Sequence, residues 1–390
     1  MVNINPLNIK YDVMVIGAGP VGIYASIRIA EAGFRVLAIE EDAQVGKPRF
    51  CTGLISKEAF DQFLLPEGAI EEEFNFATIF SPSGLKLRLK SKSPVYATDR
   101  TTFDQGLYHR AKEAGVKFLL NCRCLALKVN NDLAEARVAA LGASERTIKA
   151  EAIILATGIK YSLHKFVGLT LPPDFLDCSQ VQTAGRPMEG IEIYLGNSIA
   201  PRSFAWVVPL KKNELRIGMS TYQNSASFLK TLLKKLSLKG DFNIMRRPIP
   251  LGTIKNTYTD RVLVVGDAAG QVKPTTGGGI YFGLLCADLA AKTIIDAFKA
   301  GDFSKKFLRR YEINWKKRIE FDLTMGLYLR KLIADFSDEQ IEKLIRFSVQ
   351  EKTQRLIEKY ADFNHHGRLI KELIKMPAFW RSLHHILINK

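Results

Sequence analysis

The sequence predicts an α/β protein with a parallel-sheet domain, a second, α+β domain built on an antiparallel sheet, and a C-terminal helical region. Three observations support this prediction. Short apolar runs that end in glycine turns, such as residues 11–16, are typical of strands buried in a parallel sheet. Residues 172–250 contain mostly strand-like runs. Beyond residue 301, apolar side chains recur at helical spacing, as Ile341, Leu344 and Ile345 do.

The parallel sheet begins with one strand–helix–strand unit. Residues 11–16 predict a buried strand, residues 21–32 a helix that Gly33 ends, and residues 35–39 a second buried strand. Strands of the same apolar character return much later, at residues 152–155 and 261–265. The first domain is therefore expected to be discontinuous in the sequence.

An antiparallel strand is expected between these pieces. Residues 84–90 alternate Leu with basic residues at period two, so one face of the strand is buried and the other faces water. The resulting expected domains are residues 1–75, 95–165 and 255–300 for the first domain, 76–94 and 166–254 for the second, and 301–390 for the helical region.

The clearest local motif is GAGPVG at residues 17–22, between the first strand and the first helix. Gly17 permits a tight turn, Gly19 lets the backbone approach a pyrophosphate, and Gly22 lets the helix pack closely on the strand. Glu40 ends the next strand, where it can accept hydrogen bonds from ribose hydroxyls. Together these features predict a Rossmann-like dinucleotide site.

A second glycine-rich segment follows the strand at 261–265. It reads GDAAG at residues 266–270 and continues to three glycines, 277–279, at the start of a long helix. Asp267 suits a ribityl hydroxyl, and the positive end of the helix suits the N1–C2=O edge of a flavin, where negative charge gathers on reduction. These features favour FAD over NAD as the bound cofactor.

The two motifs, with DRTTFD at residues 99–104, resemble the FAD-binding superfamily of para-hydroxybenzoate hydroxylase. Within that superfamily the chain resembles the archaeal geranylgeranyl reductase family, which includes the digeranylgeranylglycerophospholipid reductases. Three stretches carry this closer resemblance: GKPRFCTGLIS at residues 46–56, PRSFAWVVP at 201–209, and residues 266–280.

The motifs and the resemblance together imply FAD contacts along the chain. Arg100 is expected to face the pyrophosphate, although an i, i+4 pair with Asp104 is the alternative. Cys124 is expected to act through its backbone, near the adenine. The implied FAD-contact residues are Gly17, Ala18, Gly19, Gly22, Glu40, Cys51, Thr52, Gly53, Arg100, Cys124, Asp267, Gly278, Gly279 and Ile280.

The resemblance also implies a catalytic thiol and a prenyl pocket. Cys51 is the candidate beside the flavin, as a contact or a proton donor; an ordinary packed thiol is the alternative. Phe204 and Trp206 are expected to line the pocket, or else to pack in a strand core. The family motif PxxYxWxFP is altered here, because Phe204 replaces Tyr and Val208 replaces Phe, and Gly218 lacks the second glycine of the family's downstream pair.

The function implied is FAD-dependent saturation of C=C bonds in geranylgeranyl chains of archaeal membrane lipids or their prenyl precursors. Electrons would come from an external donor, a ferredoxin or NAD(P)H. Two alternatives remain open at this point: a flavin monooxygenase acting on an aromatic or quinone, and a flavin electron-transfer protein without a substrate of its own.

Charge and composition limit the kinds of binding partner that we expect. The net charge of +16 favours acidic partners, such as an anionic membrane surface or an acidic ferredoxin, and no clustered motif points to nucleic acid. No stretch is long and apolar enough to span a bilayer, so a cytoplasmic protein with peripheral membrane contact is expected. The cysteines and histidines lack metal-ligand spacing, and we predict no metal site. The pairs His365–His366 and His384–His385 are predicted to be surface polar residues.

Overall fold

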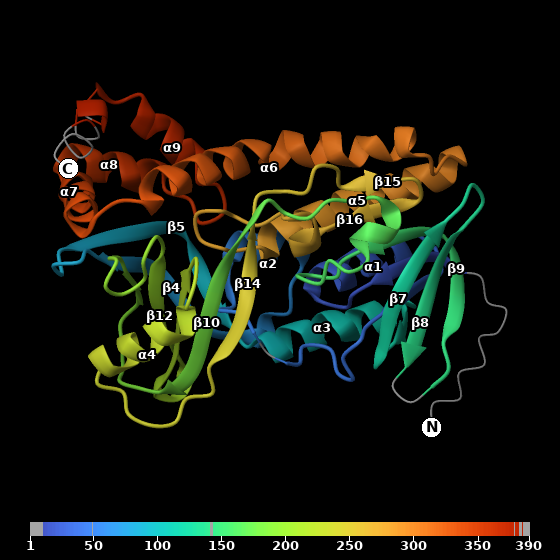
Figure 1. The fold of residues 1–390 in the computed structure, drawn as a ribbon, viewed down its shortest axis with the longest axis horizontal. Helices are drawn as coiled ribbons and strands as arrows, with labels where there is room; N and C mark the ends of the chain where they lie inside the picture. The colour runs from blue at the N-terminus through green and yellow to red at the C-terminus, as the bar shows by residue number, and fades with distance from the viewer. Residues whose placement is uncertain (1–10, 49, 141–142, 378, 382–383, 385–390) are drawn as a thin grey trace.

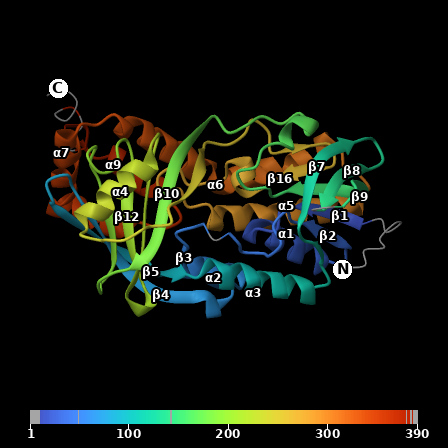
Figure 2. The same ribbon diagram turned by 60° about the horizontal axis from the view of Figure 1, so that its bottom comes forward.

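A computed structural model of the protein describes residues 11–48, 50–140, 143–377, 379–381 and 384. The molecule is elongated, with one β-sheet near each end and a long helix, α6 (Lys305–Ala334), running along both (Figure 1). The view in Figure 2 shows the same division of the two sheets. The predicted α/β class, with a Rossmann-like domain, an antiparallel sheet and a C-terminal helical region, is confirmed.

The first sheet has five parallel strands in the order β16-β9-β1-β2-β6. Its strands β1, β2 and β9 are apolar and buried where they pair, as expected for a parallel sheet covered on both faces. The short strand β15 pairs antiparallel with β16 at the edge. The bounds of these strands are Tyr11–Ile16 for β1, Val36–Ile39 for β2, Lys117–Leu119 for β6, Arg146–Leu155 for β9, Tyr258–Thr259 for β15 and Val262–Val264 for β16.

Different elements pack on the two faces of this sheet. On one face, Val13 and Val15 pack with the helices α1 (Pro20–Ala30), α3 (Arg100–Glu113), α5 (Ile280–Ala300) and α6. On the other face, Met14 and Ile16 pack with the hairpin of β7 (Cys122–Val129) and β8 (Ala134–Ala140). The carboxyl ends of the parallel strands are left open, and ligands of such sheets bind at that edge.

The second sheet has the strand order β14-β10-β13-β12-β11-β4-β5-β3 and is antiparallel except for the pair β4 and β11. One face packs against helix α4 (Ser225–Lys235) through side chains such as Leu215 and Leu229. The opposite face carries Phe74, Ile191 and Trp206. The strands are β3 (Leu54–Ser56), β4 (Ile70–Phe80), β5 (Lys86–Thr98), β10 (Asp174–Ala184), β11 (Ile191–Tyr194), β12 (Phe204–Leu210), β13 (Glu214–Thr221) and β14 (Met245–Leu251).

The second sheet takes more of the N-terminal half than the single strand expected at residues 84–90. Strands β3 and β4 belong to it as well, and β5 continues to Thr98. The paired register of β4 and β5 shifts at Phe74 and Phe76, which marks an irregularity near the middle of the strand pair. The helix α2 (Lys57–Phe63) connects β3 to this pair.

The C-terminal region is helical, as predicted. After α6 come α7 (Asp338–Ser348), α8 (Glu351–Tyr360) and α9 (Gly367–Ile374), and these three lie beside the second sheet (Figure 1). Ser337 begins α7 with a capping box, in which its side chain and that of Gln340 each accept a backbone N–H. Across the described residues, no helix combines the length and apolar character needed to cross a bilayer.

His365 and His366, which were predicted to be surface residues, are half-buried. The residues between α8 and α9 are not helical, so both neighbouring side chains can contact the rest of the protein. His365 pairs with Asp322 of α6 at 2.8 Å, and His366 forms a hydrogen bond with Thr275. His384 is exposed, and His385 lies outside the described residues.

Candidate active site

One cavity of about 1310 Å³ joins the two halves of the molecule, and every site residue predicted from the sequence lines it. Its polar end lies at the carboxyl edge of the parallel sheet, where Gly17, Glu40 and Asp267 follow β1, β2 and β16. Its apolar end lies against the second sheet, where Phe204 and Trp206 stand on β12. The cavity therefore brings together glycine-rich segments that are 250 residues apart in the sequence.

The first glycine turn has the close contacts that a dinucleotide cradle needs. A Cβ on Gly17 would lie 2.4 Å from the carbonyl oxygen of Ala156, and one on Gly22 would lie 2.1 Å from that of Gly17. A Cβ on Gly19 would meet no protein atom within 4 Å. Gly19 is the N-cap of α1, so the open space beside it is where backbone N–H groups can receive a phosphate.

Glu40 is held at this turn by the backbone. Its carboxylate accepts hydrogen bonds from the N–H of Ala18 at 2.6 Å and of Asp42 at 3.1 Å. Burial raises the pKa of Glu40, and these two hydrogen bonds oppose the rise. A carboxylate has about four lone-pair sites, so two remain for ribose hydroxyls.

Asp267 is the half-buried carboxylate of the second glycine segment. Burial raises its pKa, and the charges of Arg247 and Arg100 oppose the rise. Within the described part of the chain, no group donates a hydrogen bond to this carboxylate, while its Oδ1 would lie 2.8 Å from a Cβ on Gly279. A half-buried, cavity-lining carboxylate without a protein donor, beside the start of α5, fits a ligand that brings hydroxyl groups.

Arg100 forms the i, i+4 ion pair with Asp104 that was the alternative to a pyrophosphate contact. Its guanidinium contacts both carboxylate oxygens of Asp104, with Nη2 at 2.9 and 3.0 Å and Nε at 3.2 Å from Oδ1. Arg100 also lines the cavity. The pair fixes the guanidinium in place but leaves N–H donors for an anion, since the group has five.

The loop around Cys51 is held in part by Gln180, a residue that was not predicted from the sequence. The amide of Gln180 accepts a hydrogen bond from Thr52 Oγ1 at 2.9 Å and donates one to the Cys51 carbonyl at 3.3 Å. The thiol of Cys51 accepts the N–H of Gly53 at 3.3 Å. Cys51 is thus a cavity-lining thiol in a fixed loop, and its proposed catalytic role remains a prediction.

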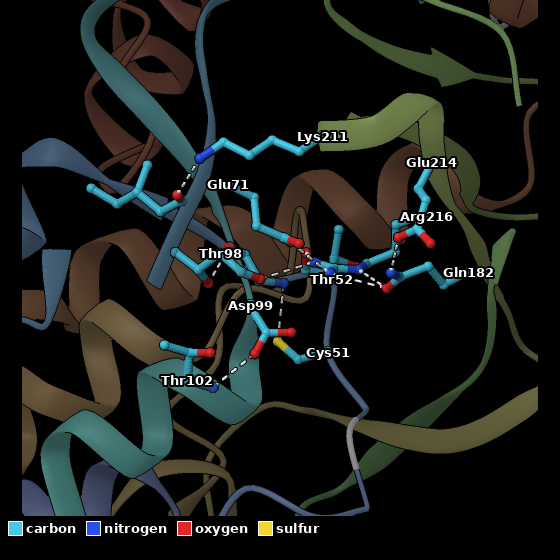
Figure 3. A network of polar contacts seen from close by, with 12 residues as sticks. Cys51, Thr52, Glu71, Thr98, Asp99, Thr102, Gln182, Lys211, Glu214 and Arg216 are labelled. Atoms are coloured by element: carbon cyan, nitrogen blue, oxygen red, sulfur yellow. Dashed lines mark hydrogen bonds and ion pairs between the residues drawn. The ribbon is translucent and has the colours of Figure 1, made fainter. Parts of the chain in front are cut away.

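Hydrogen bonds of Arg216 connect this loop to the second sheet (Figure 3). It is 1% exposed, and its guanidinium donates to the carbonyls of Thr52 at 2.6 Å and Thr98 at 3.1 Å, and to Glu71 at 3.2 Å. A buried arginine with these three partners positions the backbone on which Cys51 stands.

The apolar end is built around Trp206. Gly218 on the neighbouring strand β13 makes room for the indole, since a Cβ there would lie 2.4 Å from the ring. The ring of Phe204 lies 5.8 Å from that of Trp206, and both line the cavity. The indole N–H of Trp206 has no hydrogen-bond partner among the described residues. Their role in holding a substrate stays a prediction.

Sequence reasoning also missed a polar cluster at the cavity wall. Lys273 and His366 both line the cavity, from the second glycine segment and from the turn before α9. Arg247 lines it as well, near Asp267. A lysine directly before Pro274 and the three glycines is visible in the sequence, but its depth in the fold is not.

The meeting of both glycine-rich helix starts at one cavity defines a flavin-dependent oxidoreductase. Residues 11–184 match the family model described as pyridine nucleotide-disulphide oxidoreductase, in agreement with this class. The digeranylgeranylglycerophospholipid reductase of Methanocaldococcus jannaschii is 32% identical over 357 aligned residues, covering 87% of this chain and 90% of that protein. The chain belongs to the digeranylgeranylglycerophospholipid reductase family.

A second relative agrees with this placement, and two solved structures share the fold. Digeranylgeranylglycerophospholipid reductase 2 of Methanothermobacter thermautotrophicus is 31% identical, covering 97% of this chain and 100% of its own. A geranylgeranyl bacteriochlorophyll reductase-like protein from Thermoplasma acidophilum shares the fold with a TM-score of 0.85 at 23% identity, covering 97% of this chain and 99% of the other. The p-nitrophenol 4-monooxygenase of Pseudomonas putida has a TM-score of 0.65 at 17% identity, covering 96% and 98%.

Proposed function

We propose that this protein saturates C=C bonds in the geranylgeranyl chains of membrane lipids or of their prenyl precursors, with FAD as its bound cofactor. The observation that carries the proposal is one continuous cavity, which extends from the glycine turns to an apolar wall. Family membership supports the same substrate class, because the relatives are named for it.

The residues at the polar end fit FAD. Backbone N–H groups at Gly19 and the Arg100 guanidinium would hold the pyrophosphate, Glu40 the ribose, and Asp267 the ribityl chain. When bound, FAD supplies the hydride that an alkene needs for reduction. The chain's own contribution is to hold the alkene at the junction between the two ends and to exclude water there.

The apolar end fits a prenyl chain. On one side stand aromatic and aliphatic side chains of the second sheet, and on the other stand Leu329 of α6 and Ile370 and Leu373 of α9. An alkene that gains a proton develops positive charge at its more substituted carbon. The faces of Phe204 and Trp206 can stabilise such charge.

The decisive experiment is anaerobic conversion of a digeranylgeranyl lipid by the dithionite-reduced protein, with the product read by mass spectrometry. Dithionite replaces the natural electron donor, so the result does not depend on whether a ferredoxin or a nicotinamide acts in the cell. We expect saturated chains. Unchanged lipid, together with substrate-stimulated NADPH oxidation and peroxide formation in air, would instead indicate the monooxygenase reaction.

We further propose that α6 and the C-terminal residues contact a membrane surface, from which the lipid enters. Phe321 and Tyr328 are 50% and 57% exposed on α6, among exposed lysines such as Lys317 and Lys331. Each lysine near anionic headgroups contributes roughly 1 kcal/mol. We expect co-sedimentation with phosphatidylglycerol vesicles that weakens in high salt and weakens further in a Lys317→Glu, Lys331→Glu double variant. Equal sedimentation of both proteins would contradict this docking face.

A further inference from the structure

Lys273 is a buried cation at the wall of the cavity. It is 5% exposed, and its Nζ donates a 2.6 Å hydrogen bond to the carbonyl oxygen of Phe363. The same Nζ lies 4.3 Å from the centroid of the Phe363 ring. Within the described residues, this carbonyl is its one hydrogen-bond acceptor, and no carboxylate stands at ion-pair distance. Because an ammonium has three N–H groups, two remain for a molecule in the cavity.

The ammonium lies against the second glycine segment. A Cβ on Gly278 would be 2.9 Å from Cε and 3.4 Å from Nζ of Lys273. Backbone hydrogen bonds fix this arrangement, since the N–H of Lys273 donates to the Gly278 carbonyl at 3.1 Å and that of Gly277 to the Lys273 carbonyl at 2.8 Å. The same wall continues into the apolar residues of α9. Lys273 therefore stands where the cofactor end meets the prenyl end.

We propose that Lys273 is a catalytic residue of the reduction, and that its ammonium gives the alkene its proton. This inference rests on the proposed function. The π electron pair of the alkene forms a C–H bond with the proton released by Lys273, at the less substituted carbon. Reduced FAD, when bound at the polar end, would supply the other carbon with hydride and its two electrons. The alkene would thus gain two hydrogens at the cost of a two-electron oxidation of FAD, and the neutral amine of Lys273 would regain its proton from water.

The acidity of Lys273 suits this role. Burial lowers its pKa to about 8, although the charges of Asp362, Asp322 and Glu58 oppose the shift. A general acid works best when its pKa is near the working pH. At neutral pH the group is still protonated, and it releases its proton more readily than an exposed lysine does.

Two other titratable groups that line the cavity are poorer donors. Burial lowers the pKa of His366 to about 4, and the charge of Lys273 adds to the effect, so His366 is neutral near pH 7. Burial raises the pKa of the Cys178 thiol, which therefore holds its proton tightly. The titratable groups around Lys273 come from several elements: Glu58 of α2, Tyr281 of α5, Asp322 of α6, and Asp362, His365 and His366 of the segment before α9.

Two substitutions separate proton donation from simple positive charge. Lys273→Met removes both, while Lys273→Arg keeps the charge on a group whose pKa is above about 12 and which does not release its proton. Lys128→Met, at an exposed lysine of β7, is the matched control. The measurement is the rate of anaerobic flavin reoxidation by the prenyl lipid as a function of pH, beside FAD binding and reduction by dithionite.

We expect the wild-type rate to fall above about pH 8. Both Lys273 variants should be slower by about 10²- to 10⁴-fold and lose this fall, with FAD binding and dithionite reduction unchanged. Cys51→Ala tests the other candidate proton donor. Its rate of flavin reoxidation should still fall above pH 8, whether or not the substitution lowers that rate. In the apo protein, NMR of isotope-labelled lysine should show one side chain that titrates near pH 8 and is missing in Lys273→Met.

The inference is overturned if either Lys273 variant keeps the wild-type rate and pH dependence, or if no lysine signal titrates near pH 8. If instead the wild-type flavin is not reoxidised by any prenyl lipid, the proposed function has failed. The two failures are distinct because the first is seen only with an active wild-type protein or in the apo protein by NMR.

Discussion

Gly19→Val is expected to give a folded protein that has lost its FAD. The backbone of Gly19 has φ −73° and ψ 175°, a conformation open to valine, and a Cβ there meets no protein atom within 4 Å. The side chain would occupy the space proposed for the pyrophosphate and would block the N–H groups of the α1 terminus. Hydrogen bonds to a charged group contribute about 1.5–3 kcal/mol each, so losing two weakens binding by roughly 100-fold or more.

The measurement is FAD affinity by titration calorimetry, with thermal unfolding of the apo protein recorded beside it. Gly68→Val is the matched control, because a Cβ on Gly68 also meets no atom within 4 Å and the residue lies outside the cavity. Both variants should unfold like the wild type, and the control alone should bind FAD normally. Wild-type affinity in Gly19→Val would mean that the nucleotide does not bind at this turn.

Arg216→Met is expected to lower the free energy of unfolding by about 3–5 kcal/mol, the usual loss when one partner of a buried ion pair is removed. The substitution leaves Glu71 without this cation and the carbonyls of Thr52 and Thr98 without this donor. Since these carbonyls belong to the loop of Cys51 and to the end of β5, we also expect weaker retention of FAD.

Urea denaturation of the apo protein checks this prediction. The control is Arg137→Met, which removes an ion pair with Glu145 whose two side chains are 55% and 53% exposed. Exposed pairs contribute at most about 1 kcal/mol, so the control should change little. Equal unfolding midpoints for the two variants would show that Arg216 does not hold the Cys51 loop.

The parallel-sheet domain could be predicted from the sequence because its signals are local. Strands β1, β2 and β16 are short apolar runs that lead into glycine or an acidic residue, and the sequence separation of β1 and β2 is small. Strand β4 of the second sheet was not predicted. Its first residues include three consecutive glutamates, and its parallel partner β11 begins at Ile191, far along the chain.

The residues of the candidate site differ in the same way: those with a local sequence signal were predicted, and those without one were not. Gly17, Glu40 and Asp267 were found because each closes a recognisable strand. Arg216 and Lys273 were missed because their chemistry comes from partners that only folding supplies, 164 residues away in the case of Thr52 and 90 in the case of Phe363. His366 was misplaced because the turn before α9 has no helical face to follow.

The central claim is that one bound FAD and one prenyl chain meet in this cavity. The most direct test is an anaerobic titration of the reduced, FAD-loaded protein with a digeranylgeranyl lipid, followed by the visible absorbance of the flavin. We expect the oxidised spectrum to return in proportion to the double bonds saturated, one flavin for each bond. A flavin that stays reduced with excess lipid, yet is reoxidised at once by oxygen, would contradict the account.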